Sequence, residues 1–529
     1  MELVRKRVWL YRVAVAGLVA VLLVPVALVQ IPPIVDYPNH LARIVVLAAG
    51  ASDPFLSNIY AIHWDAIPNI GMDAVMPPML AAMSIYTAGR VMLAVAIVLP
   101  VFGTIAYSRA VLGVRSYWPL ASGLVAYNAV LLYGFMNFLI SVGLALLAAA
   151  AWIRWRDRYP VTTTVAMVLV ASIVFFAHLF GVLLLGLLIF CHEATVLVSE
   201  ATNGRLQLRQ AIVRLSMAGI IFLPAAALYT RSLAGLEGAG TDRYPFDQTL
   251  FELFAPFLLY YRRADIALAL LIVGIMVACA AIRKGLFVPE TILALGLLLV
   301  LYFSVPSVVD GSHLTIRLST MAGFLLFAGF TPRALDPRIS RTICIVLCIF
   351  VVGRVALVSQ AWVGQNHDLA ELRQVIAAIP PHSRVLATGL RRSDNVAYWN
   401  AMPRRRFVLE SIPTIDHLPA LVLIERDSFW PLLFARPRRQ PITVREAWAD
   451  LAGTGSLPGY HVLATDFPDR VETDKWSFLP NWPAKYDYVL VLLSGGAQDL
   501  ERVRPDRLEL VTRNDMAALF RVRGSNALR

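Results

Sequence analysis

Long apolar segments recur along this chain before Gln360, and they restrict its fold more than any other feature of the sequence. A helix needs roughly 20 apolar residues to cross the hydrocarbon core of a bilayer, and about eleven segments approach that length. Hydrophobic residues make up 58% of the chain and charged residues 16%, which is too apolar for a water-soluble protein of this size. The sequence therefore predicts a helical protein that crosses a membrane many times.

Basic residues between the apolar segments indicate how the chain is oriented. Arg5, Lys6 and Arg7 precede the first segment, 8–30, and Arg12 lies near its start. No small-residue cleavage site follows this segment, so we interpret it as an uncleaved first helix. Further basic clusters stand at 154–158, 205–214, 283–284 and 333–341. Because short cytoplasmic loops are rich in Lys and Arg, we place the N-terminus and these clusters in the cytoplasm. These loops hold much of the net charge of +12, so that charge does not indicate nucleic-acid binding.

Two parts of this topology depend on where helices begin and end. We predict a helix over 73–88 that returns to Arg90, and another over 91–108. The segment 117–132 is apolar but short for a span and contains a proline and an asparagine, so we interpret it as re-entrant or lying on the surface. We expect a bacterial inner membrane, and we place the residues that follow a last helix over 342–359 in the periplasm.

The residues after Gln360 differ in character from the rest. Short β-like runs occur at 384–387, 420–424, 488–493, 508–512 and 518–522. Helical patterns lie between them, at 368–378 and 443–451. The sequence thus predicts an all-α membrane bundle of about 11 transmembrane helices as the catalytic domain over 1–359, with an external loop at 31–72. A C-terminal periplasmic α/β domain over 360–529 follows.

Cysteines give no sign of a metal site or a disulfide. All four lie in apolar segments: Cys191, Cys279, Cys344 and Cys348. Two of them are four residues apart but have no histidine or carboxylate neighbours, which a metal site would need. We interpret them as buried apolar side chains.

A cluster of ionisable residues directly follows the first apolar segment. Asp36, His40 and Arg43 lie in one short stretch that contains three prolines. Charged groups at a membrane face are unfavourable unless they are solvated or used, and a rigid turn suits a carboxylate that acts as general base. We therefore interpret Asp36 as the catalytic base, and His40 and Arg43 as substrate-binding groups.

Further polar residues fall on the same predicted face of the membrane. His178 lies at the turn between two helices, and Asp310, His313 and Arg317 lie on a late external loop. We predict that these four residues bind substrate and border one external cavity with Asp36. A lone histidine at such a turn, as His178 is, is more often a structural hydrogen-bonding group, and Arg317 is also typical of an arginine that extends to the membrane interface.

The predicted location of this site restricts its chemistry. The sequence has no Walker motif, no Gly-rich nucleotide loop and no HExxH motif. A substrate outside the cytoplasm has to bring its own leaving group, and a polyprenyl-phosphate sugar does so. A guanidinium would stabilise the departing phosphate, and a carboxylate would take the proton of the acceptor hydroxyl. A single displacement inverts the anomeric centre, and it requires no cofactor.

At this point the chain resembles the GT-C superfamily of membrane glycosyltransferases, which includes protein O-mannosyltransferases and the transferases that add aminoarabinose to lipid A. These proteins place an acidic residue just after the first helix, where Asp36 stands within Pro32–Pro38. They often carry paired acids there, whereas this chain has Asp36 alone. The resemblance, over roughly residues 1–360, implies transfer from a polyprenyl-phosphate sugar to a glycan, lipid or protein acceptor. It also implies helices lying on the membrane, at 40–50 and 53–62.

Two other functions stay open. A transporter or flippase of a lipid-linked glycan would place charges deep in its spans or show inverted repeats, and the spans are nearly free of central charges. A non-catalytic envelope glycan-assembly protein would use the C-terminal domain as a binding module. Five tryptophans of that domain are candidates for stacking on sugars, although such residues more often lie in a core: Trp399, Trp430, Trp448, Trp476 and Trp482.

Overall fold

The computed structural model describes residues 2–233, 240–309, 312–470 and 476–524 and is mostly helical. The chain divides into two compact units. The first, here called the membrane unit, contains residues 1–27, 66–72 and 91–359. The second, here called the mixed unit, contains residues 28–65, 73–90 and 360–529.

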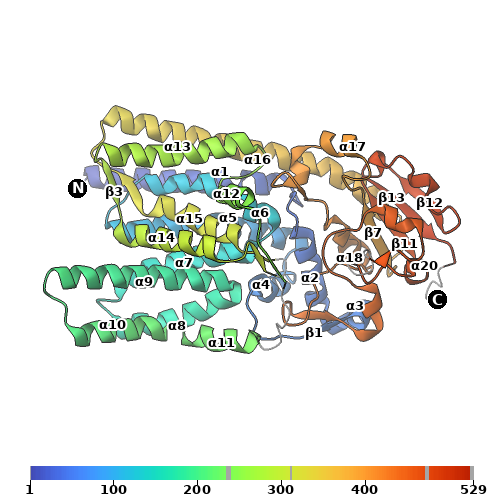
Figure 1. Cartoon of the computed structure of the whole chain (residues 1–529), viewed down its shortest axis with the longest axis horizontal. Coiled ribbons are helices and arrows are strands. Elements are labelled where there is room, and N and C mark those ends of the chain that lie inside the picture. The colour runs from blue at the N-terminus through green and yellow to red at the C-terminus, as the bar shows by residue number, and fades with distance from the viewer. Residues whose placement is uncertain (1, 234–239, 310–311, 471–475, 525–529) are drawn as a thin grey trace. The chain divides into compact units, whose positions relative to one another are not determined.

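Seven helices in the described residues are long and apolar enough to cross a bilayer. They are α1 (Glu2–Leu28), α5 (Ile85–Leu112), α7 (Met136–Trp155), α8 (Pro160–Ala177), α9 (Leu179–Thr202), α13 (Arg262–Ala281) and α16 (Pro337–Ile376) (Figure 1). An eighth span results if α10 (Leu208–Ile220) and α11 (Leu223–Leu233), which meet at 41°, are counted as one. The helices support a multi-pass membrane protein, while the expected count of about eleven stays a prediction.

Shorter elements complete the membrane unit. Three apolar helical segments are too short to qualify as spans by themselves, namely 118–133, α14 (Pro289–Ser304) and α15 (Thr315–Ala328). The remaining elements are α12 (Phe246–Glu252), β2 (Thr241–Asp242), β3 (Gly285–Phe287), β4 (Val308–Val309), β5 (Ser312–His313) and β6 (Phe330–Pro332). The strands form two small antiparallel sheets, β2-β4-β5 and β3-β6.

The chain between 71 and 133 differs from the sequence prediction. In place of helices over 73–88 and 91–108, the short α4 (Gly71–Met79) is followed by α5, which continues through Arg90 without a break. Residues 117–132 form η2 (Trp118–Val125) and α6 (Ala129–Tyr133), and their side chains are almost all buried, so they do not lie on the surface. The break between η2 and α6 is stabilised by Asn128, whose side chain accepts a hydrogen bond from the Leu131 amide at 2.9 Å.

Buried ion pairs lie between helices of the membrane unit, although the sequence suggested nearly charge-free spans. Arg354 on α16 contacts Asp265 on α13 at 2.7 Å. Glu193 on α9 is fully buried and accepts hydrogen bonds from Trp152 at 2.8 Å and Arg214 at 3.1 Å. Each charge is therefore compensated, as buried charges require.

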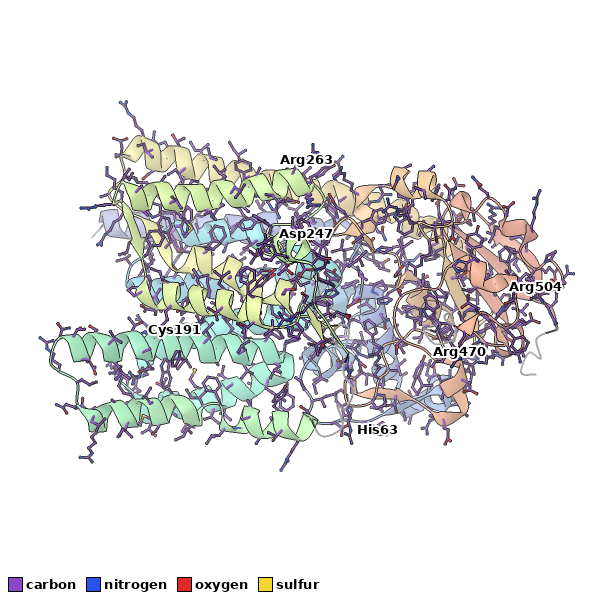
Figure 2. All side chains as sticks on the ribbon, in the orientation of Figure 1. His63, Cys191, Asp247, Arg263, Arg470 and Arg504 are labelled. Carbon is purple, nitrogen blue, oxygen red and sulfur yellow. The ribbon has the colours of Figure 1, made fainter. Side chains whose placement is uncertain are left out.

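The prediction that all cysteines are buried is partly wrong. Cys191 lies on α9 among the side chains of the membrane unit and is buried, as is Cys279 (Figure 2). Cys344 and Cys348 are exposed on α16. Their helix is long and only partly covered by neighbours, so one face of it stays open.

A four-stranded sheet lies in the C-terminal part of the mixed unit. Its order is β12 (Leu508–Arg513), β13 (Ala517–Val522), β11 (Tyr488–Leu492) and β7 (Val385–Gly389). The pair of β11 and β7 is parallel, with Leu490 opposite Ala387, and the other pairs are antiparallel. All residues of β7 and β11 are buried, which explains why both strands are mostly apolar in sequence.

The expected β run at 420–424 is wrong, because these residues belong mostly to the helix α18 (Leu421–Arg426). A short buried apolar run fits a strand and a helix equally well. The helical pattern at 368–378 is the end of α16, and the pattern at 443–451 divides into β10 (Ile442–Val444) and η5 (Glu446–Leu451). Further elements of this unit are α17 (Val396–Ala401), α20 (Trp482–Lys485), β8 (Phe407–Val408) and β9 (Ile412–Pro413).

The segment after α1 is built into the mixed unit. It forms α2 (Tyr37–Ala49), η1 (Gly50–Ser52), α3 (Pro54–Ile59) and β1 (Tyr60–Ile62). The strand β1 pairs with β10, with Tyr60 opposite Val444, and α2 packs against α18. Most side chains of α2 are buried as a result.

Candidate functional site

Asp36 occupies the position just before α2, where the prolines of the preceding turn direct the chain. Its carboxylate oxygen lies 3.2 Å from Nδ1 of His417. The Asp36 side chain is 18% exposed and that of His417 is 7% exposed. The carboxylate therefore lies at ion-pair distance from a buried imidazole and is itself partly exposed.

His417 precedes η4 (Leu418–Ala420) and packs edge-on against the rings of Trp430 and Phe434. Burial has the largest single influence on the pKa of this imidazole and lowers it, but the Asp36 carboxylate and its other neighbours together outweigh burial. Asp416 and the Gly455 backbone act in the same direction, so the pKa of His417 is raised above its ordinary value. A protonated His417 thus gives Asp36 a positively charged partner.

His40 and Arg43 lie one helical turn apart on α2. Arg43 donates two hydrogen bonds to Asp73, at 2.6 and 3.0 Å, and both side chains are buried. Its Nη2 also lies 3.1 Å from Nδ1 of His40. Burial, reinforced by the Arg43 charge, lowers the pKa of His40 to about 4. His40 is therefore neutral at pH 7, and Arg43 holds the start of α4 against α2.

Asn39 fixes the loop that covers this cluster. Its side-chain amide donates to the Leu432 carbonyl and its oxygen accepts from the Phe434 amide, both at 2.9 Å. Phe434 is thereby placed with its ring centroid 5.7 Å from that of His40 and 5.0 Å from that of His417. One aromatic ring thus packs against both imidazoles.

A second group of predicted residues lies in the membrane unit. Arg317, in the first turn of α15, is buried and lies over the ring of Phe135 at 4.3 Å and that of Phe180 at 5.6 Å. His178 caps α9, where its Nδ1 accepts a hydrogen bond from the Phe180 amide at 3.1 Å. Phe138 packs edge-on against His178. The structure thus brings Arg317 and His178 to the same aromatic cluster.

His313 joins this group through a neighbouring aromatic pair. Its ring lies 4.9 Å from that of Tyr133, which stacks on Phe135 at 5.3 Å. Tyr133 and Phe135 flank Gly134, whose φ of 103° favours glycine at the end of α6. Asp310, the remaining predicted residue, lies outside the described residues.

Glu252, at the end of α12, was missed by the sequence analysis. It is buried and accepts a hydrogen bond from the Thr315 hydroxyl, two residues before Arg317. Burial raises the pKa of Glu252 to about 7. This carboxyl can therefore accept or release a proton near neutral pH. The signal in the sequence was an isolated acid in an otherwise apolar run.

The candidate residues thus form two groups, one in each unit. Asp36, His40 and Arg43 contact each other or C-terminal residues in the mixed unit, and His178, His313 and Arg317 gather around aromatic rings in the membrane unit. That both groups border one cavity stays a prediction. Among the described residues, no three His, Cys, Asp or Glu side chains are placed to hold a metal ion.

No protein-family model matches this sequence, and no curated protein matches it either.

Proposed function

We propose that this protein is a membrane glycosyltransferase that moves a sugar from a polyprenyl-phosphate donor to an extracytoplasmic glycan, lipid or protein acceptor, with inversion. The observation that supports this proposal best is the carboxylate of Asp36, which lies 3.2 Å from Nδ1 of the buried His417 and is partly exposed. A general base has to combine these two properties, because it must keep its geometry and still reach the acceptor hydroxyl.

In this reaction Asp36 takes the proton of the acceptor hydroxyl. The hydroxyl oxygen forms a bond to the anomeric carbon while the bond from that carbon to the phosphate oxygen breaks. The electron pair leaves with the polyprenyl phosphate. His417 is a positioning residue, since its part in this reaction is to hold Asp36. One displacement from the opposite face inverts the anomeric configuration.

Arg317 is the group we assign to the donor phosphate. Two aromatic rings shield its guanidinium from water, and electrostatic attraction to a phosphate is stronger where water is excluded. His178 and His313 are assigned to the same headgroup. The topology predicted from the basic loops places the starts of α2 and α15 on the same side of the membrane.

The orientation is part of the proposal: a bacterial inner membrane, a cytoplasmic N-terminus and periplasmic residues 360–529. In this topology α5 crosses the membrane once and ends in the cytoplasm, and 118–133 crosses back outward. Every later basic loop then lies in the cytoplasm. The triple variant Val114→Cys/Cys344→Ser/Cys348→Ser should then react with membrane-impermeant maleimide only in inside-out vesicles. Reaction in intact spheroplasts would contradict this topology.

Transfer itself is tested in proteoliposomes with a panel of polyprenyl-phosphate hexoses, pentoses and N-acetylhexosamines, and with total envelope glycans and lipids as acceptors. Asp36→Asn should lower the rate by about 10²–10⁴-fold, the usual effect of losing a general base. Asp65→Asn is the matched control, because Asp65 lies in the same stretch of chain and is exposed. Equal activity of Asp36→Asn and the wild type would remove the proposed base.

A transporter of lipid-linked glycans is the second candidate, and the buried pair of Arg354 and Asp265 favours it. Ion pairs between spans are common on transport pathways. The same proteoliposomes distinguish the two functions, because a transporter moves the lipid-linked sugar to the other leaflet without forming a covalent product. Loss of such movement in Asp265→Asn, with no transfer product in the wild type, would establish transport.

A further inference from the structure

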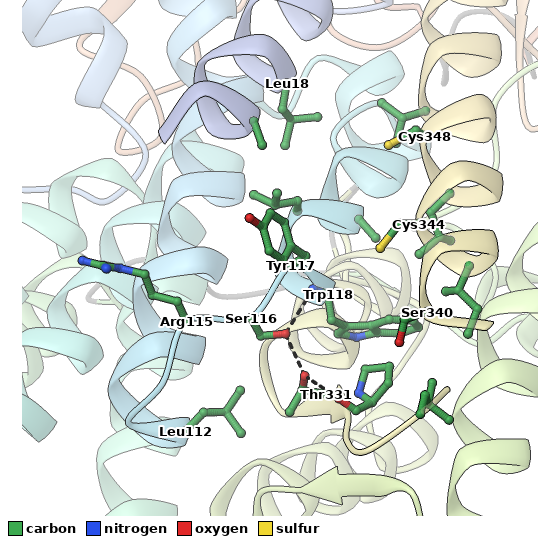
Figure 3. Close-up of a pocket in the computed structure, with 18 of the residues that line it drawn as sticks. Leu18, Leu112, Arg115, Ser116, Tyr117, Trp118, Thr331, Ser340, Cys344 and Cys348 are labelled. Atoms are coloured by element: carbon green, nitrogen blue, oxygen red, sulfur yellow. Dashed lines mark hydrogen bonds between the residues drawn. The ribbon is translucent and has the colours of Figure 1, made fainter. Parts of the chain in front are cut away.

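A cavity of about 780 Å³ lies in the membrane unit between α1, η2 and α16 (Figure 3). Pockets that hold small molecules have volumes of roughly 300–1,000 Å³, so this one is large enough for a ligand. Its walls are mostly apolar and include Leu18 and Val21 of α1 and Leu347 and Val351 of α16. The lining contains none of the residues assigned to sugar transfer.

Polar groups gather at one end of the cavity. The hydroxyls of Ser116 and Thr331 lie 2.7 Å apart, and the Ser116 oxygen accepts a hydrogen bond from the Trp118 amide (Figure 3). Ser340 lies at the same end. The hydroxyls of Ser116 and Thr331 satisfy each other, so they fix the contact between η2 and β6.

Two arginines border this end. Arg115 and Arg333 belong to the lining and are exposed. In Figure 3 the guanidinium of Arg115 extends from the edge of the cavity away from its centre. Within the described parts of the chain, no carboxylate lies at ion-pair distance from either arginine. The cavity thus combines apolar walls with positive charge at one edge.

We propose that the cavity binds an anionic phospholipid of the surrounding bilayer, with an acyl chain against α1 and α16 and its phosphate at Arg115 and Arg333. Charge complementarity selects the headgroup, since arginine binds phosphate through charge-assisted hydrogen bonds. The apolar walls select a hydrocarbon chain. A water-soluble phosphate would leave these walls without a partner.

This site is separate from the proposed sugar transfer. Arg333 belongs to the basic loop 333–341, which the positive-inside rule places in the cytoplasm. Arg115 follows the end of α5, which the proposed topology places on the same side, whereas Asp36 is predicted on the other side. Anionic lipids attract basic residues at that surface. The bound lipid holds α1 against η2 and α16, and its binding does not depend on what the protein does at Asp36.

Cys344 and Cys348 provide a direct measurement, because both line the cavity and are exposed, whereas Cys191 and Cys279 are buried. We expect dioleoyl phosphatidylglycerol, added to the full protein in detergent, to slow maleimide labelling of the two exposed thiols. Dioleoyl phosphatidylcholine should have little effect. Equal protection by both lipids, or by neither, would overturn the proposal.

Charge removal tests the headgroup. In the double variant Arg115→Gln/Arg333→Gln, the phosphatidylglycerol concentration that gives half protection should rise about thirtyfold, as expected for the loss of two basic residues near an anionic lipid. Arg262→Gln/Arg263→Gln is the matched control, because both of these arginines are exposed on α13 and do not line the cavity. An unchanged concentration in the first variant would contradict the assignment of the phosphate.

Filling the cavity tests the acyl chain. A Cβ added at Gly17 of α1 meets no atom within 4 Å, and Gly17 lines the cavity, so the side chain of Gly17→Leu should occupy part of it. Gly274→Leu is the control, because Gly274 on α13 is equally open but does not line the cavity. Native mass spectrometry should find phosphatidylglycerol on the wild type and on Gly274→Leu and far less on Gly17→Leu. Equal retention by all three proteins would overturn the proposal.

Discussion

The two groups of candidate residues hold their cations in different ways. In the mixed unit, Arg43 and His417 each lie beside a carboxylate, at 2.6 and 3.2 Å. In the membrane unit, Arg317 lies over the rings of Phe135 and Phe180. A carboxylate neutralises the cation it binds, whereas an aromatic face orients a guanidinium without neutralising its charge.

This difference distinguishes an arginine that stabilises the fold from an arginine that can bind a substrate. An arginine that forms a buried bidentate pair stabilises the fold, because removal of its partner leaves an uncompensated charge. Arg317 also contacts aromatic rings and is the residue that we propose for the donor phosphate. The comparison favours a structural role for Arg43 in holding α2 and α4 together.

The largest effect on stability is expected at the buried pair of Arg43 and Asp73. Asp73→Asn should lower the free energy of unfolding by about 3–5 kcal/mol, because Arg43 stays buried without a counter-charge. The double variant Arg43→Met/Asp73→Leu should recover most of this loss. Denaturant unfolding in mixed micelles measures both.

The matched control for this pair is Glu410→Gln, which breaks the exposed contact between Arg404 and Glu410. It should change stability by less than about 1 kcal/mol. If Asp73→Asn were as mild as this control, the pair would not support the fold, and Arg43 would return as a candidate for substrate binding.

A smaller loss of stability and a larger loss of binding are expected at Arg317. Arg317→Met should lower the free energy of unfolding by about 0.5–2 kcal/mol, the range of a cation–π contact. It should abolish binding of polyprenyl phosphate to the detergent-solubilised protein. Arg317→Lys should restore little of this binding, since an ammonium group lacks the planar donor pair of a guanidinium. A destabilisation as large as that of Asp73→Asn would remove the contrast between the two arginines.

The sequence predicted the elements whose signal is local. The strands near 384–387, 488–493, 508–512 and 518–522 are confirmed, because each is a short apolar or alternating run between turn residues. The helix boundary near Arg90 was not predictable in this way. One arginine between two apolar stretches is typical of a loop, but α5 continues through it.

Residues that depend on distant partners could not be predicted. His417 contacts Asp36 although hundreds of residues separate them, and nothing in the local sequence of His417 indicates this contact. For Glu252 the partner, Thr315, lies on another helix, so the only local signal was an isolated acid in an apolar run. By contrast, the core interpretation of the C-terminal tryptophans is confirmed for Trp430 and Trp482, which are fully buried.

The mixed unit should lose stability at both acid and alkaline pH, because the pKa values of His40 and His417 are shifted in opposite directions. The pKa of His40 is lowered from 6.5 to about 4, so its contribution is complete above pH 6.5 and is lost as the pH falls towards 4. The pKa of His417 is raised above 6.5, so its contribution is complete below pH 6.5 and is lost as the pH rises through the raised value. Hydrogen exchange of the α2 amides, corrected for intrinsic rates, should show greatest protection near pH 6.5.

Single substitutions separate the two limits. His40→Gln should remove the loss of protection at acid pH, and His417→Gln the loss at alkaline pH. The membrane unit has no part in either titration, so amides of α7 should keep the same profile in both variants. If each substitution altered both limits, the two imidazoles would titrate as one coupled pair.

The smallest effect on stability at neutral pH is expected from a substitution of Glu252. Burial raises its pKa from 4.5 to about 7, so its contribution to stability is complete below pH 4.5 and is lost as the pH rises through 7. Glu252→Gln keeps the acceptor for the Thr315 hydroxyl but cannot ionise. The variant should therefore match the wild type at pH 5 and exceed its melting temperature at pH 9. If Glu252 were instead stabilised as an anion by a nearby cation such as Arg317, the substitution would lower the melting temperature at pH 9, and Arg317 would be paired with a carboxylate as Arg43 is.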